Sequence, residues 1–410
     1  MNIDRETITK VMAMYGSSVV GIILGFSISI FNTSILGKEA FGDYKFIETV
    51  FRFIASLVSV GIFISITRML AITKDNLFKH NLIGFFVLSL IAASFIGIIL
   101  LIAFSYLEPI FFSNNLGHII RKYAFIIFAI LGNISLGEVL KGLNKIYTLA
   151  ILNSIPAAAY LILANMYNNY NTIYLEDVLL IYYGLGLIFL IFIVFRLKPK
   201  FNIDKSLFKA VLNENSTNGR PIYYGSLAGV ATTNIAGFTI SYFLNNTQVG
   251  FYTLAMTVCS PLLIVPSVLG TTFFKKFATS EFIPKKVFLF SIIATIIALL
   301  IFFLFIEKVF LLFYSKDYFP VINIAKVLIF GFMLHGYGDL INRFLGARGK
   351  GKILRNVAFM VGFVNILGYL ILVKYFGVMG AIITSIVASG LYLLMMYYYY
   401  LKFTKKYKYV

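Results

Sequence analysis

The feature that most constrains the fold of this chain is a succession of long apolar runs separated by short polar segments. A helix needs about 20 apolar residues to cross a hydrocarbon layer roughly 30 Å thick. Only helices and closed barrels satisfy their backbone hydrogen bonds in lipid, and runs this long are helices. The sequence therefore predicts an all-α integral membrane protein with about twelve spans. Their expected bounds are 11–36, 46–70, 81–107, 119–140, 146–167, 177–197, 221–245, 250–274, 287–313, 321–342, 353–375 and 378–401.

Composition agrees with a membrane location. Hydrophobic residues make up 60% of the 410 residues and charged residues only 12%, which is more apolar side chain than a soluble domain can bury. The first run is too long for a signal peptide, so we interpret it as a retained span. Cys259, which lies within an apolar run, is the only cysteine, and it offers neither a disulfide framework nor a thiolate metal site.

A short motif indicates an internal duplication. Phe41-Gly42-Asp43-Tyr44 follows the first span, and Val249-Gly250-Phe251-Tyr252 follows the seventh. The preceding spans carry Gly-x-x-x-Gly pairs, at Gly21 and Gly25 and at Gly225 and Gly229. Such pairs are common in membrane helices, but the same order of pair and motif in both halves predicts a repeat.

A second sequence similarity between the two halves supports the repeat. Residues 140–145, between spans four and five, resemble residues 345–350, between spans ten and eleven. We therefore expect two six-helix bundles related by a pseudo-two-fold axis along the membrane normal. The predicted division is an N-terminal bundle over 1–197, a basic cytoplasmic linker over 198–220 and a C-terminal bundle over 221–410.

The charges give an orientation. The chain has 35 Lys and Arg residues against 16 Asp and Glu residues, and most of the cations lie in alternate connections between spans. Cytoplasmic loops of membrane proteins are enriched in Lys and Arg. The pattern predicts that both termini are cytoplasmic. No phosphate-binding loop, nucleophile elbow or metal-ligand spacing occurs in the sequence, so we expect no enzyme, no cofactor and no metal site.

Charged residues inside spans are costly and therefore informative. Glu48 and Arg52 lie one turn apart on the second span. One interpretation is a self-neutralised pair near the outer interface. The other is that Arg52 binds an anionic group while Glu48 holds it in place. Glu48 and Glu138 are the only carboxylates that we expect within the first six spans.

Other polar residues within the spans complete the candidate sites. We predict substrate contacts for Asn133 and Asn234, because buried amides hydrogen-bond to neighbouring groups, and for Lys326, for which snorkelling to the interface is the alternative. Two further ion pairs at the inner ends of spans are predicted to act in gating or packing. They are Glu138 with Lys141, and Asp339 with Arg343.

The chain resembles the polysaccharide flippases of the multidrug/oligosaccharidyl-lipid/polysaccharide exporter superfamily, which translocate O-antigen and capsule repeat units. The resemblance rests on residues 36–44, on residues 249–252, on Gly377-Val378-Met379-Gly380-Ala381 and on the twelve-span layout. It implies a transporter in the bacterial cytoplasmic (inner) membrane. Its cargo would be an undecaprenyl-pyrophosphate-linked oligosaccharide, moved from the inner to the outer leaflet by alternating access for surface polysaccharide such as O-antigen of lipopolysaccharide, or capsule. A polysaccharide polymerase and glycosyltransferases are implied as possible partners.

Lipid II flippases related to this family carry cavity arginines on the first, second and eighth spans, whereas here only the second span has one, Arg52. This difference argues against a peptidoglycan precursor as the cargo. Two alternatives to the polysaccharide flippase remain open. A cation-coupled multidrug exporter of the same fold would need a buried carboxylate in the first bundle for Na⁺ or H⁺. A membrane scaffold for glycan assembly would act through its basic inner face.

Overall fold

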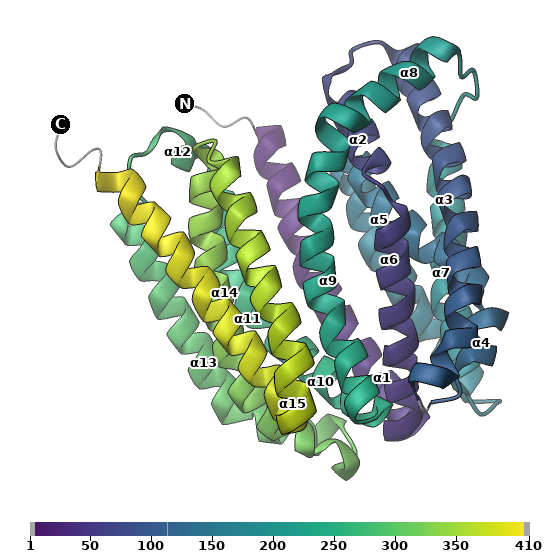
Figure 1. The fold of residues 1–410 in the computed structure, drawn as a ribbon, viewed down its shortest axis with the longest axis vertical. Helices are drawn as coiled ribbons and strands as arrows, with labels where there is room; N and C mark the ends of the chain where they lie inside the picture. The colour runs from purple at the N-terminus through teal and green to yellow at the C-terminus, as the bar shows by residue number, and fades with distance from the viewer. Residues whose placement is uncertain (1–4, 113, 406–410) are drawn as a thin grey trace. The chain divides into compact units, whose positions relative to one another are not determined.

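The computed structural model describes residues 5–112 and 114–405, and these residues form helices with short connections and no strand. The predicted all-α membrane fold is confirmed. The chain divides into two compact units, residues 1–230 and residues 231–410, each with its own packed interior (Figure 1).

Unit 1 contains the helices up to the first half of α9. They are α1 (Arg5–Val58), α2 (Ile62–Ile72), α3 (Asn76–Phe111), α4 (Gly117–Lys122), the short 3₁₀ turn η1 (Ala124–Ile126), α5 (Ile127–Gly142), α6 (Ile146–Asn168), α7 (Leu175–Arg196), α8 (Lys205–Glu214), the π-helical turn η2 (Asn215–Gly219) and α9 (Arg220–Phe243). Large aromatic side chains such as Phe46, Phe51 and Phe86 are fully buried in its interior. Burial of such side chains is what holds the bundle together away from the lipid.

Unit 2 contains the second half of α9 and the helices that follow it. They are α10 (Asn246–Cys259), α11 (Pro261–Thr272), α12 (Phe274–Thr279), α13 (Lys285–Phe313), the 3₁₀ turn η3 (Lys316–Tyr318), α14 (Pro320–Ala347) and α15 (Gly351–Lys405). At one end of the unit, Phe277, Phe344 and Met396 form a fully buried cluster that joins α12, α14 and α15.

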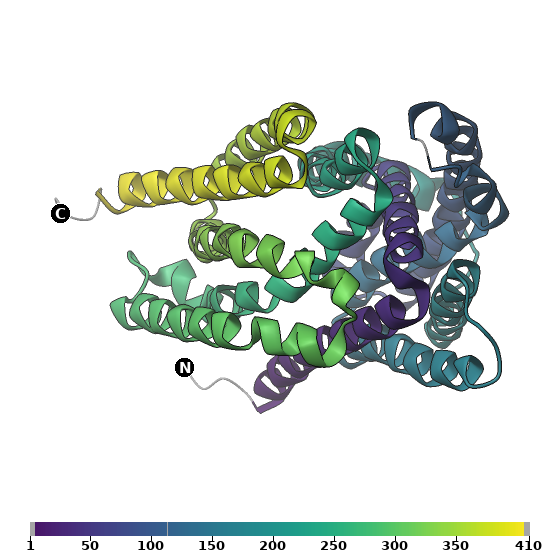
Figure 2. The same cartoon turned by 90° about the horizontal axis from the view of Figure 1, so that it is seen from below.

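Two of the helices are hairpins rather than single rods. The backbone leaves the helical region at Gly37 in α1 (φ 69°) and at Gly377 in α15 (φ 57°). Positive φ favours glycine because a Cβ atom would crowd the backbone there. Figures 1 and 2 show the two segments of α15 folding back on each other. Each of these helices therefore supplies two of the predicted spans.

Within the described residues, eight helices are long and apolar enough to cross a membrane, or nine if the bent pair α10 and α11 counts as one span. Splitting α1 and α15 at their glycines, and joining α4 with α5, gives segments that correspond to the expected spans. The chain is thus a multi-pass membrane protein with about twelve helices in two bundles.

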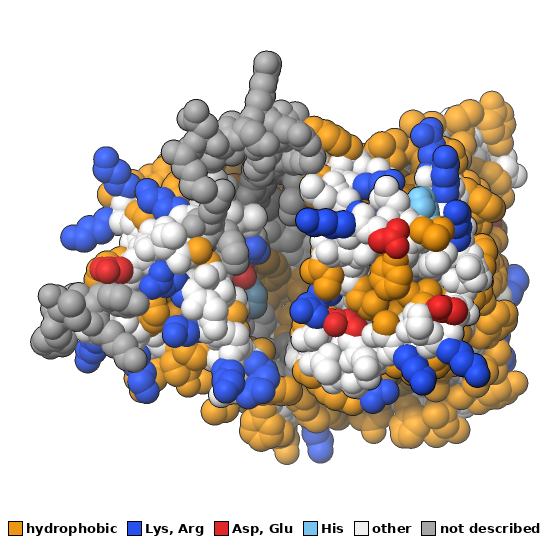
Figure 3. All heavy atoms as spheres, turned by 90° about the horizontal axis from the view of Figure 1, so that it is seen from above, with side chains coloured by type: hydrophobic (Ala, Val, Ile, Leu, Met, Phe, Trp, Pro, Cys, Tyr) orange, Lys and Arg blue, Asp and Glu red, His pale blue; other side chains and the backbone are white. Residues whose placement is uncertain are grey.

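The basic segment 198–220 packs on the helices of unit 1. Leu207 and Val211 of α8 are buried, and the guanidinium of Arg68 on α2 pairs with Glu214 at the end of α8. The hydroxyl of Tyr223 on α9 donates to the carbonyl of Leu57 at 2.7 Å. The first turns of α9 therefore belong to unit 1. Figure 3 looks onto the end of the molecule that carries α8 and shows Lys and Arg side chains gathered there.

Candidate functional site

The first candidate site is built around Arg52 on the second segment of α1. Its Nε and Nη2 atoms donate to Oε1 of Glu48 at 2.9 and 2.7 Å, and Lys45 Nζ donates to Oε2 of Glu48 at 2.9 Å. Only 14% of the Glu48 side chain is exposed, whereas 47% of the Arg52 side chain is. One carboxylate thus holds two cations, and the cluster of three keeps a net positive charge. A fixed, half-exposed guanidinium is suited to bind a phosphate or carboxylate group.

Tyrosine side chains of α7 lie near this charge cluster, and a tyrosine of α6 packs against one of them. Tyr182 and Tyr183 of α7 lie within electrostatic range of both Arg52 and Glu48. The ring of Tyr160 on α6 meets that of Tyr182 edge to face, with centroids 5.2 Å apart. Tightly packed aromatic rings with hydroxyl groups make a rigid polar wall beside the arginine.

The structure places Arg52 further from the start of its helical segment than the expected span bounds suggest. Those bounds start the second span at residue 46, but the helix already resumes directly after Gly37, through the polar residues 38–45. Arg52 is therefore about four turns, or roughly 20 Å, from the break at Gly37.

The second copy of the repeat carries no charges at the positions of the Arg52 cluster. When the two halves of the sequence are aligned at Tyr44 and Tyr252, three charged positions of unit 1 correspond to three uncharged positions of unit 2. Lys45, Glu48 and Arg52 correspond to Thr253, Met256 and Ser260. Both tyrosines are buried, at 2% exposure each, so the packing role is common to the two copies. The charge cluster is an addition specific to one half.

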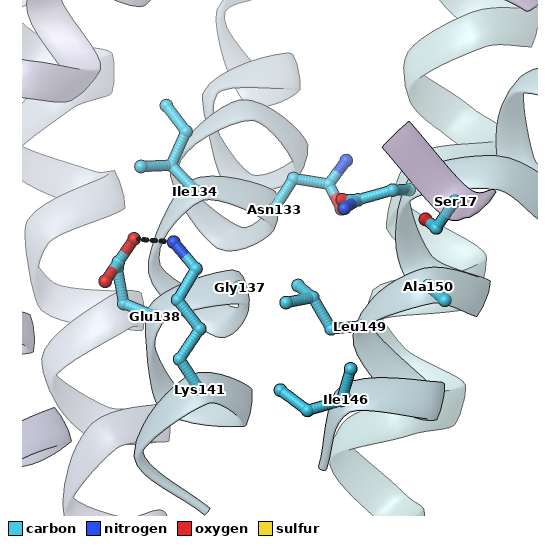
Figure 4. A pocket seen from close by; sticks show the side chains of 10 residues that line it. Ser17, Asn133, Ile134, Gly137, Glu138, Lys141, Ile146, Leu149 and Ala150 are labelled. Atoms are coloured by element: carbon cyan, nitrogen blue, oxygen red, sulfur yellow. Dashed lines mark hydrogen bonds and ion pairs between the residues drawn. The ribbon is translucent and has the colours of Figure 1, made fainter. Parts of the chain in front are cut away.

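The second candidate site is a pocket of about 470 Å³ in unit 1 (Figure 4). It lies between the start of α1, the end of α5 and the start of α6. Its lining residues are Ser17, Asn133, Ile134, Gly137, Glu138, Lys141, Ile146, Leu149, Ala150 and Asn153. The structure thus brings together Asn133, Glu138 and Lys141, which the sequence analysis predicted for separate roles.

The polar groups of the pocket are of several kinds. Lys141 Nζ donates to Glu138 Oε1 at 2.6 Å, and both side chains are about half exposed. Figure 4 shows the Asn133 amide pointing across the pocket toward Ser17. Its Oδ1 atom is buried and has no hydrogen-bond partner within the described residues. Buried polar atoms without a partner are rare, and this oxygen is free to accept a hydrogen bond from a group that enters the pocket.

In unit 2, Arg343 connects α14 to α11. Its Nε atom donates to Asp339 Oδ2 at 2.9 Å, and its two Nη atoms donate to the hydroxyls of Thr271 and Ser267 at 2.8 and 3.0 Å. An added Cβ at Gly270 would lie 2.4 Å from Cδ of Arg343, so α11 and the arginine are in close contact. The planar fork of the guanidinium fits this arrangement of three acceptors.

The other two predicted contacts lie elsewhere in unit 2. Lys326 Nζ donates to Glu307 Oε1 of α13 at 2.6 Å, and 31% of the lysine side chain is exposed. Asn234 is partly buried on α9. Neither lines the pocket of unit 1.

The sequence analysis missed Glu108. The expectation that Glu48 and Glu138 are the only carboxylates of the first six spans is wrong, because α3 continues to Phe111 and includes this glutamate. Its side chain is fully buried, Oε2 accepts from the Gly117 N–H at 2.9 Å, and Oε1 has no hydrogen-bond partner in the described part of the chain. The apolar residues 109–112, which follow Glu108 in the sequence, are the signal that the span continues past it. Among the described residues no group of three or more His, Cys, Asp or Glu side chains could hold a metal ion.

Comparison with solved structures identifies the class of fold. The structure is similar to that of the lipid II flippase MurJ in an inward closed conformation, with a TM-score of 0.73 and 15% identity over 97% of this chain and 90% of that one. It is similar to an inward-facing multidrug resistance MATE family transporter of the MOP superfamily, with a TM-score of 0.74 and 14% identity over 96% and 99% of the two chains. A MOP superfamily transporter from Pyrococcus furiosus has a TM-score of 0.55 and 15% identity, over 96% of each chain.

The sequence identifies the family within that class. The model of the family described as polysaccharide biosynthesis protein matches residues 8–274, so the chain belongs to this family. The resemblance found in the sequence is thereby confirmed. No curated protein matches the chain.

Proposed function

We propose that this protein is a flippase that moves undecaprenyl-pyrophosphate-linked oligosaccharide repeat units from the inner to the outer leaflet by alternating access. The observation that carries the proposal is Arg52, a half-exposed guanidinium fixed by Glu48 and placed about four turns along the helix. A pyrophosphate needs such a cation inside the protein, because a charge taken from water must be paired. Membership in the polysaccharide biosynthesis family supports the choice of cargo.

The uncharged repeat positions support a functional role for the Arg52 cluster. A charge within a span costs at least about 2.5–3.5 kcal/mol on insertion scales. Unit 2 folds the same motif with Thr253, Met256 and Ser260 in place of the charges. The absence of charges from unit 2 supports a ligand, rather than packing, as the reason for this cost in unit 1.

The remaining predicted residues take secondary roles in this proposal. Asn133, Asn234 and Lys326 would contact the glycan or the pyrophosphate. Glu138 with Lys141, and Asp339 with Arg343, would change partners as the protein alternates between its two states. We place the protein in the bacterial inner membrane with both termini in the cytoplasm. Glycosyltransferases on the cytoplasmic side would supply the cargo, and a polymerase on the outer side would use it.

The proposal can be tested in living cells by measuring the amounts of surface polysaccharide and of its lipid-linked precursor. Arg52→Ala and Arg52→Glu should lower surface polysaccharide and cause the lipid-linked oligosaccharide to accumulate in the inner leaflet. Arg355→Ala is the matched control, because Arg355 is exposed and hydrogen-bonds to its neighbour Asn356. Unchanged surface polysaccharide in both Arg52 variants would rule out the role given to this arginine.

A second candidate function, a cation-coupled multidrug exporter, is favoured by Glu108. This carboxylate is fully buried in unit 1, and one of its oxygens has no hydrogen-bond partner in the described residues. A buried carboxylate is the kind of group that binds H⁺ or Na⁺ in transporters. Efflux of a cationic dye driven by an imposed ion gradient, and lost in Glu108→Gln, would support this candidate, whereas dye retention by the wild type would exclude it.

A further inference from the structure

We propose that the pocket between α1, α5 and α6 binds a sugar ring of the cargo, beyond the sugar that is attached directly to the pyrophosphate. This inference rests on the proposed function. It assigns the glycan part of the cargo to a place in unit 1 that is distinct from the charge cluster at Arg52.

The lining of the pocket matches the chemistry of a sugar. Asn133 and Asn153 supply amides that both donate and accept, Ser17 supplies a hydroxyl, and Glu138 and Lys141 supply an acceptor and a donor. The buried Oδ1 of Asn133 lacks a donor, and a sugar hydroxyl would provide one. A purely apolar cargo such as a lipid tail would leave these groups unpaired.

The apolar part of the lining suits the other face of a sugar ring. Leu149 and Ile134 lie beside Gly137, where an added Cβ would be 3.7 Å from Cδ1 of Leu149. A sugar ring presents C–H groups on its faces and hydroxyls at its rim. Binding sites for such ligands combine an apolar surface with a few directed polar groups.

Helix α7 links the pocket to the charge cluster. Tyr182 and Tyr183 lie within electrostatic range of Arg52. Gly186 follows them by about one turn, and its Cβ position would be 3.2 Å from Nδ2 of Asn133. The charge cluster and the pocket therefore lie at successive positions along α7, with a helix rise of roughly 5 Å between the residues that face each, to which the lengths of the Arg52 and tyrosine side chains add.

That separation gives the proposal a specific consequence. We expect a cargo with one sugar on its pyrophosphate to be too short to reach the pocket while its anion is held at Arg52. A longer oligosaccharide can occupy both places at once. The pocket should therefore matter for long cargoes and not for short ones.

The test compares two cargoes in sealed liposomes. One is undecaprenyl pyrophosphate with a single sugar, and the other carries four sugars, taken from a panel of hexose, N-acetylhexosamine and hexuronic acid chains. Asn133→Ala and Asn153→Ala should each slow translocation of the four-sugar cargo by about three- to tenfold, the effect of one lost hydrogen bond. The one-sugar cargo should move at the wild-type rate. Asn165→Ala, an exposed position further along α6, is the matched control.

Other outcomes overturn the proposal. Equal loss for both cargoes would mean that the amides have a structural role, and no loss for either would mean that the pocket is not used. If Arg52→Ala is harmless while the amide variants still discriminate by length, the role of Arg52 fails and the pocket stands.

A binding measurement covers the case in which the wild type moves neither cargo. The chain contains no tryptophan, so Ile146→Trp places a single fluorescent reporter at the pocket. Free tetrasaccharides from the same panel should shift its emission, and inorganic pyrophosphate should not. Asn133→Ala should raise the tetrasaccharide concentration needed for the shift by about three- to tenfold. No response to any tetrasaccharide would overturn the pocket assignment independently of transport.

Discussion

Asn144 and Gly349 occupy the same position in the turns that end α5 and α14. Both have a left-handed backbone, with φ of 55° and 72°. In each turn the next residue donates back to the helix, Lys145 N–H to the Leu140 carbonyl at 2.9 Å and Lys350 N–H to the Leu345 carbonyl at 3.0 Å. This is a Schellman cap in both halves. The sequence similarity between residues 140–145 and 345–350 thus corresponds to the same helix cap in each half.

The cap makes a prediction about Asn144. Asparagine tolerates the left-handed region better than other residues with a Cβ atom, and glycine tolerates it best. Asn144→Ala should lower the free energy of unfolding by about 1 kcal/mol, and Asn144→Gly should leave it unchanged or raise it. Thermal unfolding of the detergent-solubilised protein measures both. Equal stability of the alanine and glycine variants would contradict the assignment.

Tyr160 makes a second prediction. Its hydroxyl donates to Oδ1 of Asn32 at 2.5 Å, and both side chains are buried, which joins α6 to the first segment of α1. Tyr160→Phe should cost about 1–3 kcal/mol, because the asparagine oxygen is left without its donor.

A double variant provides the control for Tyr160. Removing the asparagine as well, in Tyr160→Phe with Asn32→Leu, takes away the unpaired group and should recover part of the loss. Additive losses in chemical unfolding would show that the hydrogen bond does not couple the two residues.

Arg343 makes a third prediction. Its three hydrogen bonds to Asp339, Thr271 and Ser267 use the fork of the guanidinium, which the ammonium of lysine cannot reproduce. Arg343→Lys should lower the free energy of unfolding by about 1–2 kcal/mol. Arg355→Lys, at an exposed position, should have no measurable effect. A neutral Arg343→Lys variant would show that the fork contributes no stability.

The spans and their turns were predictable because their signals are local. Apolar runs give the helices, and glycine at 37 and 377 marks the hairpin breaks. The start of the second span was placed too late, because span bounds drawn from hydropathy stop at the first polar residues. The helix continues through residues 38–45, since a helix satisfies its own backbone whether or not lipid surrounds it. Glu108 was missed for the same reason.

The pocket could not be predicted, because it depends on packing between distant parts of the chain. Asn133 and Lys141 share one helix, but Ser17 and Asn153 join them only when α1 and α6 pack against α5. Helical periodicity indicates which residues of one helix share a face. It does not indicate which faces of three helices meet.

Translocation by purified protein in sealed liposomes tests the central claim most directly. The cargo is an undecaprenyl-pyrophosphate oligosaccharide, and an external hydrolase reports its arrival in the outer leaflet. We predict protein-dependent transfer that Arg52→Ala slows by about ten- to hundredfold, the effect of a lost hydrogen bond to a charged group, and that Arg52→Lys partly restores. Transfer by Arg52→Ala at the wild-type rate would contradict the account.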